Sequence, residues 1–114
     1  MTVSQRLNKT VSVTLNASGV GTAIVGPAQR FEVWKVERLV TEGSSAVEPE
    51  LNIYRGASSA VVPSDFTPFG NSDISETTTE FELMDGETIT IAYSGGSANA
   101  VMRLRIEGWI NYRQ

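Results

Sequence analysis

The chain has 114 residues, contains neither cysteine nor histidine, and carries a net charge of −4. A chain of this length forms one domain, and without these two residue types it has no disulfide, no thiolate or imidazole metal ligand and no imidazole for acid–base catalysis. Hydrophobic residues make up 40% of the sequence and helix-forming residues are sparse, which indicates a packed all-β protein.

The acidic residues are concentrated in one part of the chain. Residues 56–102 contain seven Asp and Glu residues and no Lys or Arg, and a surface of that charge repels the phosphates of nucleic acid. No apolar run approaches the roughly 18 residues of a membrane span, and no secretory signal pattern precedes the first strand. We therefore expect a protein made in a cytoplasm, with neither nucleic acid nor a membrane as its partner.

The N-terminal part of the chain divides into a polar segment and two short strands. Residues 1–10 are polar and weakly patterned, so they predict an N-terminal arm or an edge strand, followed by a sandwich domain over residues 11–114. Alternating apolar and polar residues predict strands at 11–15 and 20–25. Gly26 and Pro27 end the second of these strands.

The middle of the chain contains the longest strand signal. Residues 30–41 have large apolar side chains on both faces, so we expect this strand to be central, and twisted or bulged. A further strand is predicted at 51–55. Residues 57–78 are rich in turn-forming residues and predict a long loop, after which 79–83 forms another short strand.

The clearest pattern lies between Gly86 and Trp109. Apolar residues alternate with polar ones on both sides of a Ser-Gly-Gly-Ser turn at 94–97, which predicts a β-hairpin with one face on a core. Strands at this spacing indicate an antiparallel sandwich or a barrel. The candidate core consists of the inward-facing apolar residues of the predicted strands, namely Trp34, Val36, Ile53, Phe81, Leu83, Ile89, Ile91, Met102, Leu104 and Ile106.

The opposite face of the last strand supplies the candidate interface. Arg103, Arg105 and Trp109 alternate with the apolar residues and point outward, and Tyr112 lies near the chain end. Together with Arg6 and Leu7 of the N-terminal segment they form the candidate interface set, because Trp, Tyr and Arg are enriched where proteins meet. Packing within the chain and a ligand platform remain alternatives for the outward aromatic residues.

No residue pattern predicts catalysis. Glu80 and Glu82 form an i, i+2 carboxylate pair of the kind that glycosidases use, but they lie opposite the inward Phe81 and Leu83 and therefore point to solvent. The oxygen-rich segment at 65–76 has the ligands that calcium prefers, yet its spacing fits no EF-hand and Asx-turn chemistry explains it. We predict no catalytic residue, no cofactor and no metal site, and therefore a protein that is not an enzyme.

From about Gly19 onward, the turns and strand signatures together resemble small virion proteins of tailed phages that infect actinobacteria. The matching features are Gly26-Pro27, Trp34-Lys35-Val36, Ile53-Tyr54-Arg55-Gly56, Phe69-Gly70-Asn71-Ser72-Asp73, Gly86-Glu87 and Ser94-Gly95-Gly96 followed by a strand ending in Gly108. The resemblance implies a single-domain, jelly-roll-like antiparallel β-sandwich that is built into a phage particle.

The resemblance also implies a function. We expect a non-enzymatic capsid decoration or minor capsid protein that stabilises the virion, contacts the major capsid protein or other virion proteins, and forms a homo-oligomer such as a trimer. The alternative is a minor tail or fibre module that binds a host-surface glycan through Tyr54, Trp109, Tyr112 and the segment 57–78. The motifs do not decide between head and tail.

Overall fold

The computed structural model describes residues 3–27, 29–47, 49–55, 59–60 and 74–112. These residues form eight strands, and they include no helix that is long and apolar enough to cross a membrane. The strands are β1 (Val3–Thr14), β2 (Gly21–Val25), β3 (Glu32–Gly43), β4 (Glu50–Arg55), β5 (Ser59–Ala60), β6 (Ile74–Leu83), β7 (Ile89–Ser94) and β8 (Val101–Tyr112).

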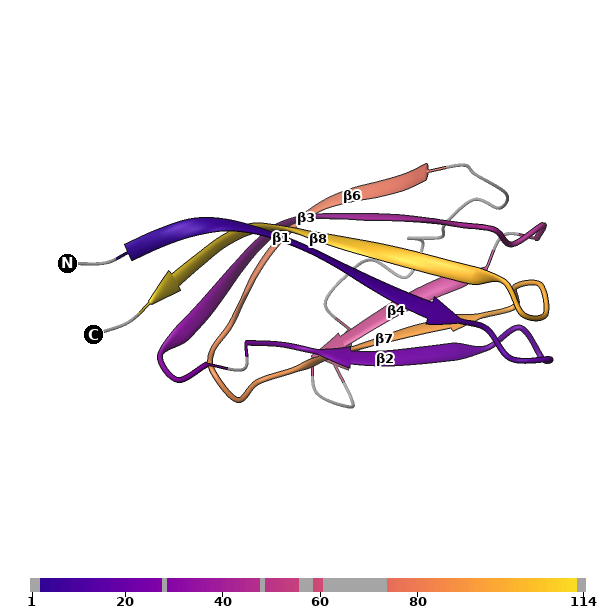
Figure 1. Cartoon of the computed structure of the whole chain (residues 1–114), viewed down its shortest axis with the longest axis horizontal. Helices are drawn as coiled ribbons and strands as arrows, with labels where there is room; N and C mark the ends of the chain where they lie inside the picture. The colour runs from indigo at the N-terminus through magenta and orange to yellow at the C-terminus, as the bar shows by residue number, and fades with distance from the viewer. Residues whose placement is uncertain (1–2, 28, 48, 56–58, 61–73, 113–114) are drawn as a thin grey trace.

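The strands form two four-stranded sheets, which lie one over the other in Figure 1. The start of β1 and the end of β8 lie together at the left of this view. One sheet has the order β1-β8-β3-β6 and the other has the order β2-β7-β4-β5. The pairs β1·β8, β2·β7, β3·β6 and β4·β5 are all antiparallel, as in one long two-stranded ribbon. Rolling that ribbon adds the contacts β3·β8 and β4·β7. This connectivity is a jelly roll, so the predicted antiparallel sandwich of the jelly-roll kind is confirmed.

The hairpin predicted between residues 86 and 109 is wrong. β7 pairs with β2 and β4 in one sheet, whereas β8 pairs with β1 and β3 in the other. The turn at 94–97 therefore carries the chain from one sheet to the other. Alternation fixes which side chains face the core, but it does not say whether two successive strands lie side by side or face each other across that core.

The central position and the bulge predicted for β3 are both confirmed. β3 lies between β8 and β6, and its register shifts between Val36 and Arg38. The extra residue moves the inward face from Trp34 and Val36 to Leu39, which explains why both parities of this strand carry large apolar side chains. Gly108 lies opposite the bulge, where a Cβ atom would run into the backbone carbonyl of Lys35.

The core lies between the two sheets. Among the predicted core residues, Trp34, Val36, Ile53, Leu83, Ile89, Ile91, Met102, Leu104 and Ile106 are at most 4% exposed, and Phe81 is partly buried against them. The same cluster also contains residues that the prediction did not include, namely Leu7, Val13, Leu15, Leu39, Leu51, Tyr93 and Ala100.

Two boundaries differ from those expected. β1 runs without interruption from Val3 to Thr14 at the edge of its sheet and so crosses residue 10, where the sequence placed the end of an arm or edge strand. β6 begins at Ile74, not at residue 79, and its Ser/Thr-rich first half pairs with β3. Threonine is β-branched and fits a strand well, so a run that reads as turn chemistry completes the sheet here. The rest of the predicted loop, apart from β5, lies outside the described residues.

Candidate assembly interface

The outer side of the sheet β1-β8-β3-β6 gathers charged side chains and one exposed tryptophan. We call this surface the arginine face. It consists of Arg6 from β1, of Arg38 and Glu42 from β3, and of Arg103, Arg105, Glu107 and Trp109 from β8. Residues directly opposite on paired strands share a face, and the register places Arg6 opposite Trp109, and Arg38 opposite Glu107. The strand register thus brings four arginines together on one side of the sandwich.

Trp109 is held at the surface by a neighbouring cation. Its side chain is 37% exposed, although large apolar groups elsewhere on β8 are buried. The guanidinium of Arg6 lies 4.7 Å from the ring centroid, within the range of a cation–π interaction. Arg6 therefore covers part of the indole and fixes its position on the face.

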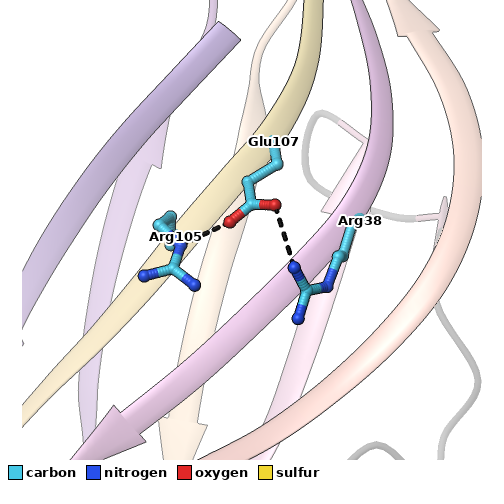
Figure 2. A network of polar contacts seen from close by, with 3 residues as sticks. All are labelled: Arg38, Arg105 and Glu107. Carbon is cyan, nitrogen blue, oxygen red and sulfur yellow. Dashed lines mark hydrogen bonds and ion pairs between the residues drawn. The ribbon is translucent and has the colours of Figure 1, made fainter.

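Glu107 lies between two arginines, as Figure 2 shows. Its Oε1 atom accepts a hydrogen bond of 3.2 Å from Nη1 of Arg38, and its Oε2 atom accepts one from Nε of Arg105. The hydrogen bond from Arg105 is the main cause that lowers the pKa of Glu107 below its ordinary value, while partial burial acts in the opposite direction. The Glu107 side chain is 16% exposed, whereas those of Arg38 and Arg105 are 42% and 45% exposed.

A shallow hollow adjoins this ion-pair network. It is lined by Thr10, Val40, Glu42, Arg103 and Arg105 and has a volume of about 60 Å³. Sites that enclose a small-molecule ligand have volumes of roughly 300–1,000 Å³. The hollow could take one side chain of a partner or a few water molecules, so the arginine face is suited to contact with another surface.

The structure brings together four of the six candidate interface residues. Arg6, Arg103, Arg105 and Trp109 share the arginine face. Leu7 is 2% exposed and belongs to the core, which corrects its assignment to the interface. Leu7 follows Arg6 on one strand and therefore points to the opposite side of the sheet.

Tyr112 also lies apart from the arginine face. It has the same parity as the inward Ile106 and Gly108 on β8, and its hydroxyl accepts a hydrogen bond of 3.1 Å from Nε2 of Gln5. Tyr54 is on β4 in the other sheet. The aromatic residues that were expected to form a glycan platform are therefore separated, and most of the segment 57–78 that would join them lies outside the described residues.

Sequence reasoning missed Arg38 as a member of this face. The bulge before Arg38 shifts the alternation of β3 by one residue, so counting along the strand from Trp34 gives the wrong side. The only available signal was the presence of large apolar residues on both parities of that segment.

The described residues contain no group of three or more His, Cys, Asp or Glu side chains that could hold a metal ion. Of the predicted Asx-turn segment at 65–76, Asp65, Asn71 and Asp73 lie outside the described residues, whereas Glu76 is part of β6.

Comparison with known proteins gives similarity at the level of the fold. No family model matches this chain, and no curated protein is significantly similar to it. A solved structure described as "CBM4 structure and function" is 14% identical, with a TM-score of 0.48, over 90% of this chain and 83% of that one. The cryo-EM structure of the extra small virus VLP of the giant freshwater prawn Macrobrachium rosenbergii is 13% identical, with a TM-score of 0.41, over 96% of this chain and 81% of that one.

These similarities are too distant to transfer a function. The class of protein is defined by the chain's own strand order, which is that of a jelly-roll β-sandwich. The outer face of its sheet β1-β8-β3-β6 is charged.

Proposed function

We propose that the chain is a non-enzymatic structural protein of a phage virion, which is made in the host cytoplasm and joins the capsid as a decoration or minor capsid protein. The observation that supports this function is the arginine face, where Arg6 stacks on the exposed Trp109 beside Arg103 and Arg105. Arginine and tryptophan are the residues that most often dominate the energy of protein interfaces. The resemblance of the turn and strand signatures to those of phage virion proteins supplies the proposed setting.

The charge of the face indicates the chemistry of the partner. On β1, β8 and β3 the four arginines and Lys35 stand against the carboxylates of Glu42 and Glu107, while the outward Glu80 and Glu82 lie on β6 at the edge of the same sheet. The part formed by β1, β8 and β3 therefore favours an acidic surface on the major capsid protein or on another virion protein. Arg103 is 50% exposed and its Nη1 atom lies 4.0 Å from Oε1 of Glu42. A contact this long leaves the guanidinium available for a carboxylate of the partner.

The experiment is a binding assay on purified phage particles that lack this protein. We expect the wild-type chain to rebind, and the variants Arg105→Glu and Trp109→Ala to lose at least about tenfold in affinity, which is about 1.4 kcal/mol. Arg30→Glu is the matched control, because Arg30 is an exposed arginine outside the arginine face. Equal binding by all four proteins would overturn the role of this face.

Copy number then tests the location. A capsid decoration protein is present in hundreds of copies per particle, and quantitative mass spectrometry of complete particles measures this number. A handful of copies would place the chain in the tail. Binding of the purified chain to a glycan array, abolished in Trp109→Ala, would replace the capsid proposal by the glycan-binding alternative.

A further inference from the structure

The sheet β1-β8-β3-β6, which has the longer strands, has a long strand at each of its two edges. Among the described residues, β1 and β6 each have one neighbour and contain 12 and 10 residues, whereas the edges of the other sheet, β2 and β5, contain 5 and 2. An edge strand presents unpaired backbone N–H and C=O groups that can pair with a further strand. The register of β1 with β8 is unbroken from Val3 to Thr14, so β1 offers a regular template along its whole length.

The directions of these two strands allow copies to add to one another. The sheet has an even number of strands and each pair is antiparallel, so β1 and β6 run in opposite directions. If β6 of one copy lies beside β1 of the next in the same orientation, the new pair is again antiparallel. The arginine faces of both copies then lie on the same side of the extended sheet.

The charges of the two strands are complementary. β1 contains Arg6 and Lys9 and no acidic residue, and both of these side chains are exposed. β6 contains three glutamates, at positions 76, 80 and 82, and no basic residue, and Glu80 and Glu82 are exposed. Pairing of β1 with a second β1 would bring like charges together, as would pairing of two β6 strands. Only the mixed pair joins opposite charges.

Lys9 adds to the preference of β1 for β6 over a second β1. It lies opposite the buried Ile106 and so faces the inner side of the sheet, yet it is exposed. An inward-facing charge on an edge strand discourages pairing with strands that offer it no counter-charge. The glutamates of β6 lie on the outer side of the sheet, where they face Arg6 and not Lys9. Pairing of two β1 strands would bring two such lysines to the inner side, whereas the mixed pair brings only one.

We propose that β1 of one copy pairs with β6 of a second copy, so that the sheet β1-β8-β3-β6 continues from one molecule into the next. Nη1 of Arg55 already donates a hydrogen bond of 2.8 Å to the carbonyl of Glu82, so the pairing involves the part of β6 before that residue. The contact is head to tail and gives a ring if its rotation closes. This inference deepens the proposed assembly role by naming the self-association surface.

The test is sedimentation velocity of the purified full chain over a concentration series, with no phage particle present. We expect the wild-type protein to self-associate, and Arg6→Glu and Glu80→Lys each to raise the dissociation constant by at least about tenfold, because both residues lie on the outer side of the sheet and each reversal replaces an attraction by a repulsion. Arg30→Glu and Glu50→Lys are matched charge reversals at exposed positions away from both edges, and we expect them to leave it unchanged. Melting curves establish that every variant is folded.

Three outcomes would overturn the proposal. One is a wild-type chain that stays monomeric at all accessible concentrations. Another is self-association that Glu80→Lys leaves unchanged, which would show that β6 is not part of the contact. The third is equal weakening by the control reversals. None of these results alters binding through the arginine face to particles, so failure of this inference is distinguishable from failure of the proposed function.

Discussion

Glu107 is the charged residue whose contribution to stability the structure defines best, because two arginines bind one partly buried carboxylate. Its pKa is lowered in the folded protein, chiefly by the hydrogen bond from Arg105. The stabilisation is therefore present above the pKa of an unfolded glutamate and is lost as the pH falls through the lower pKa of the folded state.

We expect Glu107→Gln to lower the free energy of unfolding at pH 7 by about 1 kcal/mol, the upper end for partly exposed ion pairs. The difference from wild type should disappear once the pH is below the pKa of Glu107 in the folded protein. Urea unfolding at a series of pH values measures both effects. Glu42→Gln is the control, because Glu42 contacts Arg103 only at 4.0 Å. A difference that does not change with pH would contradict the role assigned to the charge.

A buried hydroxyl pair joins the two sheets. Thr41 of β3 and Tyr93 of β7 are both fully buried, and their hydroxyl oxygens are 2.7 Å apart. The Thr41 hydroxyl also donates to the carbonyl of Arg103 at 2.9 Å. A threonine hydroxyl has one proton, so Tyr93 is the donor in the contact between the two side chains.

We expect Thr41→Val to cost about 1–3 kcal/mol, because it leaves the Tyr93 hydroxyl buried without an acceptor. Tyr93→Phe should cost less, and the double variant should cost less than the sum of the two, which a double-mutant cycle by urea unfolding measures. Burial raises the pKa of Tyr93 to about 12. The stabilisation that the neutral Tyr93 hydroxyl gives to the folded protein is therefore complete below pH 10 and is lost as the pH rises through about 12. Strict additivity in the cycle would contradict the hydrogen bond.

At the scale of the strands, the bulge in β3 and Gly108 in β8 depend on each other. The bulge brings the β3 backbone so close that only glycine fits opposite it. We expect Gly108→Ala to destabilise the protein by at least about 3 kcal/mol, since the clash is with backbone and cannot be relieved by rotating a side chain.

Gly95→Ala separates this effect from backbone strain. Gly95 has a φ of 74° and open space around it, so its substitution should cost only about 1 kcal/mol, from the left-handed conformation alone. Chemical denaturation compares the two variants. Similar losses for both would contradict the steric account of Gly108.

Strand patterns in the sequence predicted that most of the strands exist and which side chains of β8 face outward. They did not predict which strands pair with each other. Alternation along β8 correctly put Arg103, Arg105 and Trp109 on one side. It could not reveal that β7 and β8 belong to different sheets, because inward and outward faces look the same in either arrangement. Grouping Arg6 with Leu7 in the interface failed because consecutive strand residues face opposite ways, and Arg38 was missed because a bulge resets the alternation.

For the whole molecule, we expect the pairing of β1 with β8 to limit the rate of folding. Val3 lies opposite Tyr112, and contacts between residues so distant in sequence slow folding. We expect a circular permutant, with these two strands joined by a short glycine-rich linker and new ends between Ser94 and Gly95, to fold to the same structure and to refold about tenfold faster, because β1 and β8 become a local hairpin.

Stopped-flow tryptophan fluorescence measures the refolding rate of the permutant and of the wild-type chain. A wild-type chain with the linker residues added at one end, but not permuted, is the control for the linker itself. An unchanged or slower rate in a correctly folded permutant would show that pairing of β1 with β8 does not limit folding.

The position of β8 between β1 and β3 has a consequence for synthesis in the cell. Until β8 leaves the ribosome, β1 has no neighbour in its sheet and β3 can pair only with β6, so this sheet is split into separate pieces. A nascent chain of this protein therefore cannot mature gradually from its N-terminus. We expect it to remain an open, aggregation-prone intermediate until the 12 residues of β8 have been translated, and to close only then.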